Sequence, residues 1–200
     1  PGGLAPSETA APVLAWPGRG LAALAVIAFC ALMAEGVIND WSAIFLSQTL
    51  DAGPGFAPLG YAVFSVTMII GRLAGGPLTH HIRPARLMGL GGVIVAGGVL
   101  LCVAATNGAV ALAGFAVIGL GLASVFPLAV SAAGRRRDRP PATAVAAVAT
   151  AGYSGFLVGP AVVGLLASLF GLRAGLAVLV LLGALVAGLC LRRHPTGGVE

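Results

Sequence analysis

The polar residues most able to do chemistry in this sequence are Glu35, Asn39 and Asp40, which lie inside the long apolar stretch 21–46. A charged side chain at membrane depth costs about 2.5–3.5 kcal/mol on insertion scales, and such residues usually mark a functional site. Glu35 and Asn39 are four positions apart and therefore share one helix face. The pattern predicts a proton-coupling or substrate-binding carboxylate at Glu35. A structural carboxylate, hydrogen-bonded to a neighbouring helix, is the alternative.

Asp40 is predicted to occupy a different environment from Glu35. On a helix that turns 100° per residue, the two side chains point about 140° apart. Asp40 also lies nearer one end of the stretch, beside Trp41, and tryptophan is typical of the aromatic belt at a membrane boundary. We therefore expect Asp40 to contact substrate or to serve in an outer gate or a helix contact. Glu35 is the favoured coupling residue.

The elements that position these residues are predicted to be transmembrane helices. Hydrophobic residues make up 58% of the 200 positions and charged residues only 8%, whereas about 25% of a soluble domain is charged. Each apolar run is near or above the roughly 20 residues that span a bilayer core. The six runs cover residues 21–46, 57–78, 87–106, 108–133, 142–170 and 174–191. They do not alternate as barrel strands do, so the expected fold is an all-α integral membrane bundle of six transmembrane helices.

The ends of the chain and the loops predict its orientation. Residues 1–18 are rich in Pro and Gly and lack the pattern of a signal peptide, which predicts a cytoplasmic linker. The bundle is expected over 19–193, followed by a cytoplasmic tail over 194–200. Nine arginines flank the spans on one side and only Arg173 flanks them on the other. By the positive-inside rule, both termini face the cytoplasm.

Further candidate residues lie in the second, fourth and fifth runs. Arg72, one turn above a loop, either snorkels to the interface or pairs with a carboxylate. Pro127 and Pro160 each leave a helix carbonyl without its usual partner and bend the helix. The fifth run also carries a polar stripe at positions i, i+3 and i+4, formed by Thr150, Tyr153 and Ser154. Kinked helices with polar faces suit a gated bundle around a cavity.

Several other kinds of protein are disfavoured. The motifs of zinc proteases, nucleophile-elbow hydrolases and phosphate-binding loops are absent, so the sequence predicts no catalytic residues and no cofactor. Cys30, Cys102 and Cys190 stand alone in apolar runs, without metal-site or disulfide spacing. The net charge of +5 comes from arginines in short loops, which act as topology signals and do not form a nucleic-acid-binding face.

Four segments of the chain resemble the C-terminal half of a major facilitator superfamily transporter, of a sugar-permease-like or substrate-unassigned bacterial branch. They read EGVINDWSAIFL, GRLAGGPL, GLGLASVFPL and GYSGFLVGP. The basic loop after the second run is similar to the family pattern G-x-x-x-D-R-x-G-R-R. Gly76 opens it, His80 and His81 stand at the Asp-Arg positions, and Arg83 and Arg86 supply the basic residues. The acidic residue of the family's loop lock is missing.

The resemblance implies one six-helix half of a twelve-helix secondary transporter. Such a protein moves a small organic solute across the bacterial inner membrane by alternating access, and the present chain would couple this to protons as a symporter or antiporter. It would need an N-terminal six-helix half, fused or separate. The family's first and fourth helices line the central cavity, which would place there Glu35, Asn39, Ser124 and Phe126. Gate or flanking helices would carry Arg72, Thr150, Tyr153 and Ser154. A non-transporting scaffold or receptor-like remnant of the fold is the alternative.

Overall fold

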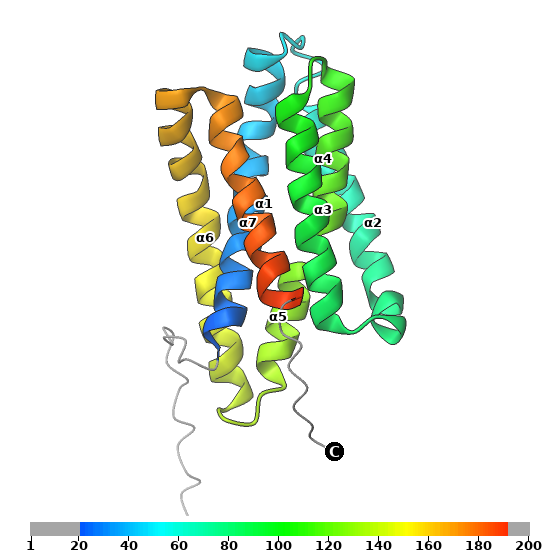
Figure 1. Cartoon of the computed structure of the whole chain (residues 1–200), viewed down its shortest axis with the longest axis vertical. Helices are drawn as coiled ribbons and strands as arrows, with labels where there is room; N and C mark the ends of the chain where they lie inside the picture. Colours follow the sequence, from blue (N-terminus) through cyan, green and yellow to red (C-terminus); the bar gives the residue numbers. More distant parts are fainter. Residues whose placement is uncertain (1–20, 192–200) are drawn as a thin grey trace, which may run out of the picture.

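The computed structural model describes residues 21–191, which form a bundle of helices roughly aligned along one axis (Figure 1). The helices are α1 (Ala22–Thr49), α2 (Leu59–His81), α3 (Pro84–Ala104), α4 (Gly108–Leu122), α5 (Val125–Gly134), α6 (Pro141–Phe170) and α7 (Leu172–Leu191). Six spans in the described residues are long and apolar enough to cross a membrane, with α4 and α5 together forming the fourth. These confirm the predicted spans. The predicted linker and tail lie outside the described residues.

Local sequence accounts for several helix boundaries. Pro84 and Pro141 stand at the first positions of α3 and α6, where the missing proline N–H costs no helix bond. Asn107 caps α4, because its side-chain oxygen accepts a hydrogen bond of 3.0 Å from the Val110 N–H. Gly171 ends α6 with a positive φ of 85°, a conformation that side chains with a Cβ rarely adopt.

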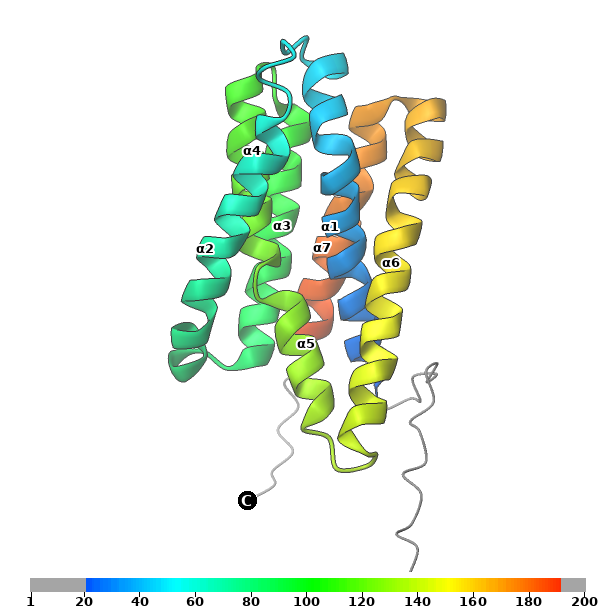
Figure 2. The same cartoon turned by 180° about the vertical axis from the view of Figure 1, so that it is seen from behind.

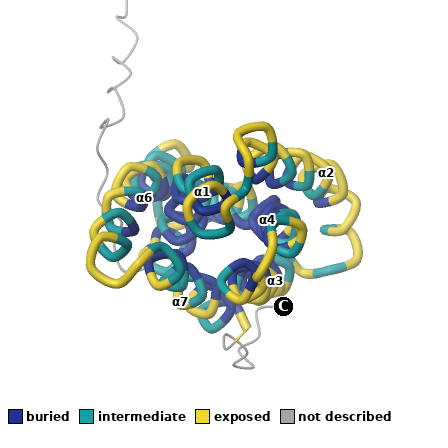
Figure 3. The backbone as a smooth tube through the Cα atoms, turned by 90° about the horizontal axis from the view of Figure 1, so that it is seen from above, coloured by how far each residue is buried: buried dark blue, intermediate teal, exposed yellow. Residues whose placement is uncertain are grey.

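The helices form two faces of different character. Figure 2 shows α1, α2, α5 and α6 on one face of the bundle, and Figure 1 shows α3 and α7 side by side on the other. Seen along the bundle axis, α2 and α6 lie at the two flanks and are largely exposed (Figure 3). The apolar third and sixth spans, α3 and α7, pack against one another.

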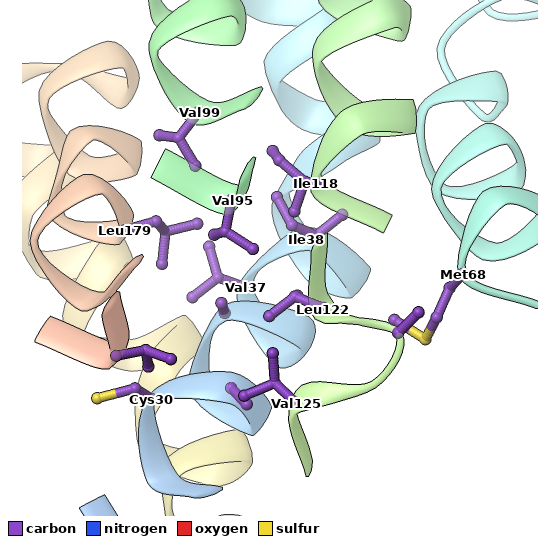
Figure 4. Packing of buried hydrophobic residues seen from close by; sticks show 14 of the residues in the cluster. Cys30, Val37, Ile38, Met68, Val95, Val99, Ile118, Leu122, Val125 and Leu179 are labelled. Atoms are coloured by element: carbon purple, nitrogen blue, oxygen red, sulfur yellow. The ribbon is translucent and has the colours of Figure 1, made fainter. Parts of the chain in front are cut away.

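A single apolar core joins the two faces. Side chains from α1, α3, α4 and α7 converge in Figure 4, among them Val37, Val95, Ile118 and Leu179. Cys30 and Cys102 are buried, as expected for cysteines that act as small hydrophobes. The core therefore holds α1 in the middle of the bundle, where its polar residues face the side formed by α2, α5 and α6.

The fourth span is broken between α4 and α5, at Ala123 and Ser124. The break lies where Pro127 removes the N–H that would otherwise bond the Ala123 carbonyl, so the predicted bend is found. A new helix then starts with a 3.1 Å bond from the Leu128 N–H to the Ser124 carbonyl. Pro160, in contrast, lies within the unbroken helix α6.

Glycines bring the backbones of α1 and α6 into direct contact. A Cβ atom built on Gly36 would lie 2.6 Å from the carbonyl oxygen of Phe156. This is the carbonyl that Pro160 leaves without an N–H donor in its own helix. One turn further along α6, Gly159 packs in the same way against the Met33 carbonyl. Small residues at such positions let membrane helices approach closely.

Trp41 adds a side-chain bond to the same helix pair. Its indole Nε1–H donates a 3.1 Å hydrogen bond to the Pro160 carbonyl oxygen, and its ring lies against Gly164. The side chain is half-buried. Trp41 thus binds α6 through its polar atom, a contact that its predicted place in an aromatic belt does not include.

Replacing Gly36 by alanine tests the backbone contact. The Gly36→Ala methyl group would overlap the Phe156 carbonyl, so α1 and α6 must separate, and we expect the variant to lose about 1–3 kcal/mol of stability. Gly97→Ala in α3 is the matched control, because a Cβ there meets nothing within 4 Å and alanine is the better helix former. Thermal unfolding in detergent measures both variants. Equal midpoints for the two would contradict the contact.

Candidate functional site

Glu35 and Arg72 meet between α1 and α2. Arg72 Nη2 lies 3.9 Å from Glu35 Oε2, and the side chains of Arg72 and Glu35 are 49% and 27% exposed, respectively. With a rise of 1.5 Å per residue, Glu35 is about 20 Å from the start of α1 and Arg72 about 14 Å from the end of α2, so both lie well inside their spans. The distance is that of an ion pair and exceeds that of a hydrogen bond. Two alternatives were predicted for Arg72, snorkelling to the interface or pairing with a carboxylate, and the structure shows the pairing.

A cavity of about 360 Å³ adjoins Arg72 between α2 and α5. Both walls are continuous helical faces, with lining residues spaced i, i+3, i+4 and i+7. The α2 wall consists of Arg72, Gly75, Gly76 and Thr79, and the α5 wall of Ser124, Pro127, Leu128 and Ser131, with Ala123 at the helix break. The polar side chains are therefore one guanidinium and three hydroxyls. This set can bind the oxygen atoms of a small polar solute.

Two of these hydroxyls, Thr79 and Ser131, were not singled out from the sequence. Thr79 lies seven residues after Arg72, and Ser131 lies seven residues after Ser124, so each continues a polar helix face. That spacing is a usable signal, but its meaning depends on α2 and α5 facing one another. The structure shows this contact at Gly75, where a Cβ atom would lie 2.5 Å from Ser124 Oγ.

Asn39 and Asp40 form an exposed polar group one turn along α1 from Glu35. Asn39 Nδ2 donates a 2.8 Å hydrogen bond to Asp40 Oδ1. The structure therefore joins Asp40 to Asn39, a contact that the helical wheel does not predict. The two residues remain outside the cavity between α2 and α5.

The predicted residues of α5 and α6 come together through an aromatic pair. The rings of Phe126 and Tyr153 are 6.1 Å apart in an edge-to-face arrangement. Phe126 also packs against Gly152. Tyr153 is 61% exposed, Ser154 is exposed and Thr150 is half-buried. The polar stripe of α6 thus begins beside α5 and opens on the exposed flank of the bundle.

The residues of the predicted loop motif lie mainly in helices. Gly76 is in α2, where it lines the cavity. His80 and His81, interpreted as loop residues, form the last turn of α2. Arg83 immediately precedes α3, without a capping hydrogen bond from its side chain, and Arg86 is in the first turn of the helix. The loop between the two helices is therefore very short.

Arg173 performs a structural role that the sequence did not reveal. Its guanidinium donates hydrogen bonds to the carbonyl oxygens of Val103 and Ala105, the second at 2.7 Å. It also lies 5.7 Å from the centroid of the Phe45 ring. Arginine at the C-terminal end of a helix binds carbonyls that have no partner in the helix. The single arginine on this side of the predicted membrane thus caps α3.

Outside the spans, Asp138 forms an ion pair within the loop between α5 and α6. Arg136 Nε donates a 2.8 Å hydrogen bond to Asp138 Oδ1, and Nη2 donates one of 3.2 Å to Oδ2. These hydrogen bonds lower the pKa of Asp138. The Asp138 carboxylate therefore neutralises the charge of one of the four arginines in this loop. The loop as a whole remains basic.

The fold and the intramembrane ion pair define a multi-pass helical membrane protein. The Major Facilitator Superfamily model matches residues 24–199, and the chain belongs to this family of transporters. An uncharacterised MFS-type transporter of Yersinia pestis is 32% identical over 88% of the chain and 46% of its own length. Membrane protein MosC of Rhizobium meliloti is 30% identical over 88% of the chain and 44% of its own length. The chain thus spans about half the length of these curated relatives.

Solved structures share the fold at low sequence identity. The E. coli fucose:proton symporter FucP is 16% identical, with a TM-score of 0.78 over 90% of this chain and 44% of its own. A peptide transporter, POT, is 15% identical, with a TM-score of 0.78 over 91% of this chain and 40% of its own. These likenesses confirm the predicted six-helix half of the twelve-helix family fold.

Proposed function

We propose that this chain is the C-terminal half of a secondary active transporter that moves a small organic solute by alternating access, coupled to protons. The observation that carries the proposal is the Glu35–Arg72 ion pair beside the cavity between α2 and α5. Intramembrane ionisable residues commonly form proton relays or substrate sites. Here an acid and a base from different helices adjoin a hollow that a solute can enter.

The ion pair supplies a physical route for coupling. The guanidinium of Arg72 keeps its charge, whereas the Glu35 carboxylate can gain or lose a proton. Protonation of Glu35 removes its attraction for Arg72 and leaves the guanidinium available for a solute oxygen in the cavity. Deprotonation restores the pair and competes with the solute. Asn39 and Asp40 supply a second polar group along the same helix.

The fold neighbours support this type of transport. One of them is a fucose:proton symporter, and another is a peptide transporter. A sugar or a small peptide offers the hydroxyl, carbonyl or carboxylate oxygens that Arg72, Thr79 and Ser124 can bind. The lining of the cavity therefore favours a small polar solute.

A second six-helix half is proposed to cover the exposed flanks of α2 and α6. Val66, Ile69 and Leu73 of α2 are more than half exposed, and so is Leu157 of α6. Lipid could cover these apolar groups alone. However, the same flanks carry polar side chains within the spans, including Arg72, Tyr153 and Ser154, and polar groups at this depth face protein or water.

The proposal also includes the membrane in which the chain lies and its orientation there. The positive-inside rule places the end with the α2–α3 and α5–α6 loops in the cytoplasm, and both chain termini face that side. The sequence relatives are bacterial proteins, which favours a bacterial inner membrane. The site would then be reached alternately from the cytoplasm and from outside.

Glu35→Gln tests proton coupling in the protein as the cell makes it. A screen of labelled sugars, dipeptides and organic acids first identifies a transported solute. The amide cannot exchange a proton, so we expect proton-driven accumulation of that solute to be abolished while energy-independent counterflow persists. Asp138→Asn, which makes the same carboxylate-to-amide change in the loop between α5 and α6, is the matched control and should keep accumulation. Normal accumulation by Glu35→Gln would show that its carboxylate is structural.

The requirement for a second half is tested with the 200 residues alone. Reconstituted into sealed vesicles, they should show no uptake above protein-free vesicles, because one wall of the central site is missing. Co-reconstitution with a six-helix N-terminal half should restore it. Uptake by the 200 residues alone would refute the proposed partner.

A further inference from the structure

A second hollow lies away from the candidate transport site, at the end of the bundle where α2 passes into α3 and where α7 ends. This recess has a volume of about 700 Å³. Its basic lining consists of His81, Arg83 and Arg86, and its apolar lining includes Ile82 and Leu191. In Figure 1 this end of α3 and the end of α7 both lie toward the bottom of the bundle.

The recess is built to attract an anion. No acidic side chain lines it among the described residues. Within residues 21–191, the side chains of His81, Arg83 and Arg86 make no hydrogen bond or ion pair. The α3 helix also starts here with no acidic residue in its first turn and no side-chain cap. Its unbonded N–H groups and helix dipole add to the positive potential.

An exposed apolar stripe leads from the recess along α3. Arg86 shares one helix face with Leu90, Val93 and Ile94, at spacings of i+4, i+7 and i+8. All four are exposed, and Leu90, Val93 and Ile94 are among the exposed large hydrophobics. The other sides of α3 pack against α4 and α7. The guanidinium of Arg86 thus lies at the end of an apolar face of α3. In a membrane, only hydrocarbon can cover this face favourably.

We propose that this recess binds the phosphate of an anionic phospholipid, with its acyl chains lying along Leu90, Val93 and Ile94. Arg83 and Arg86 donate hydrogen bonds to the phosphate oxygens, and His81 contacts the polar headgroup. Basic pockets between membrane helices on the cytoplasmic side recognise anionic headgroups in this way. A soluble anion would use the arginines but not the apolar stripe, so the lipid is the better match.

The proposal requires only that the bundle spans a membrane, and it is independent of proton coupling. The recess lies on the side of α3 and α7, whereas the Glu35–Arg72 pair lies between α1 and α2. A bound lipid would hold together the end of α2, the start of α3 and the end of α7. Loss of transport in Glu35 variants would therefore leave lipid binding unchanged.

Native mass spectrometry tests the site in the detergent-solubilised protein as the cell makes it. Phosphatidylglycerol should be retained in preference to phosphatidylcholine of the same acyl chains. The double substitution Arg83→Gln/Arg86→Gln should lower phosphatidylglycerol affinity about 25-fold, since each basic residue near an anionic surface contributes a factor of about five. The Arg83→Lys/Arg86→Lys variant should recover much of the affinity, because the charge is restored.

The matched control is Arg137→Gln/Arg139→Gln, which removes the same charge from the α5–α6 loop at the same end of the bundle. It should bind phosphatidylglycerol as the unmodified protein does. An equal loss in both double variants, or no loss in either, would overturn the site. The unmodified protein gives a test without any substitution. Equal retention of the two lipids, or displacement of phosphatidylglycerol by millimolar inorganic phosphate, would overturn the assignment to lipid.

Discussion

The cost of placing the Glu35 carboxylate inside a hydrocarbon layer constrains the whole bundle. A charge at that depth must face a counter-ion, water or another polar group, and Arg72 of α2 provides the counter-ion 3.9 Å away. This pairing requires α1 to be held firmly among its neighbours. The glycine contacts with α6 and the Trp41 hydrogen bond to Pro160 do so on one side. The apolar helices α3 and α7 close the other side.

The sequence predicted most of what depends on local composition. Six spans follow from hydropathy, and the break before α5 follows from the chemistry of Pro127. The family resemblance added the topology, which the comparisons confirm. Each of these features is encoded within a single helix or in the order of helices.

Contacts between helices were harder to predict. The Glu35–Arg72 pair depends on how α1 and α2 are rotated and offset, and a sequence offers only the two residue types. Arg173 binds carbonyls about 70 residues away in the chain, so its spacing carries no signal. The hydrogen bond between Asn39 and Asp40 depends on the rotamers of the two side chains, and a helical wheel does not include rotamers. Thr79 and Ser131 became meaningful only once α2 and α5 were seen to face one another.

The arginines show how one residue type serves several physical purposes in the same protein. Arg72 pairs with a carboxylate inside the bundle, and Arg173 caps the end of α3. Arg83 and Arg86 line a recess at the end of the bundle where α2 passes into α3. Counting arginines by side therefore predicts the orientation, but their individual roles depend on burial and on neighbouring helices. The charge of the loops is thus more than a topology signal.

The most direct test of the ion pair is a double-mutant cycle on Glu35 and Arg72. The free energy of unfolding in detergent is measured for Glu35→Gln, Arg72→Gln and the double variant, in the protein as the cell makes it. If the two residues act as one pair, the double variant loses no more stability than the more impaired single variant, because residues in one network are not additive. A loss in the double variant equal to the sum of the two single losses would contradict the pairing, since it would show that the two residues act independently.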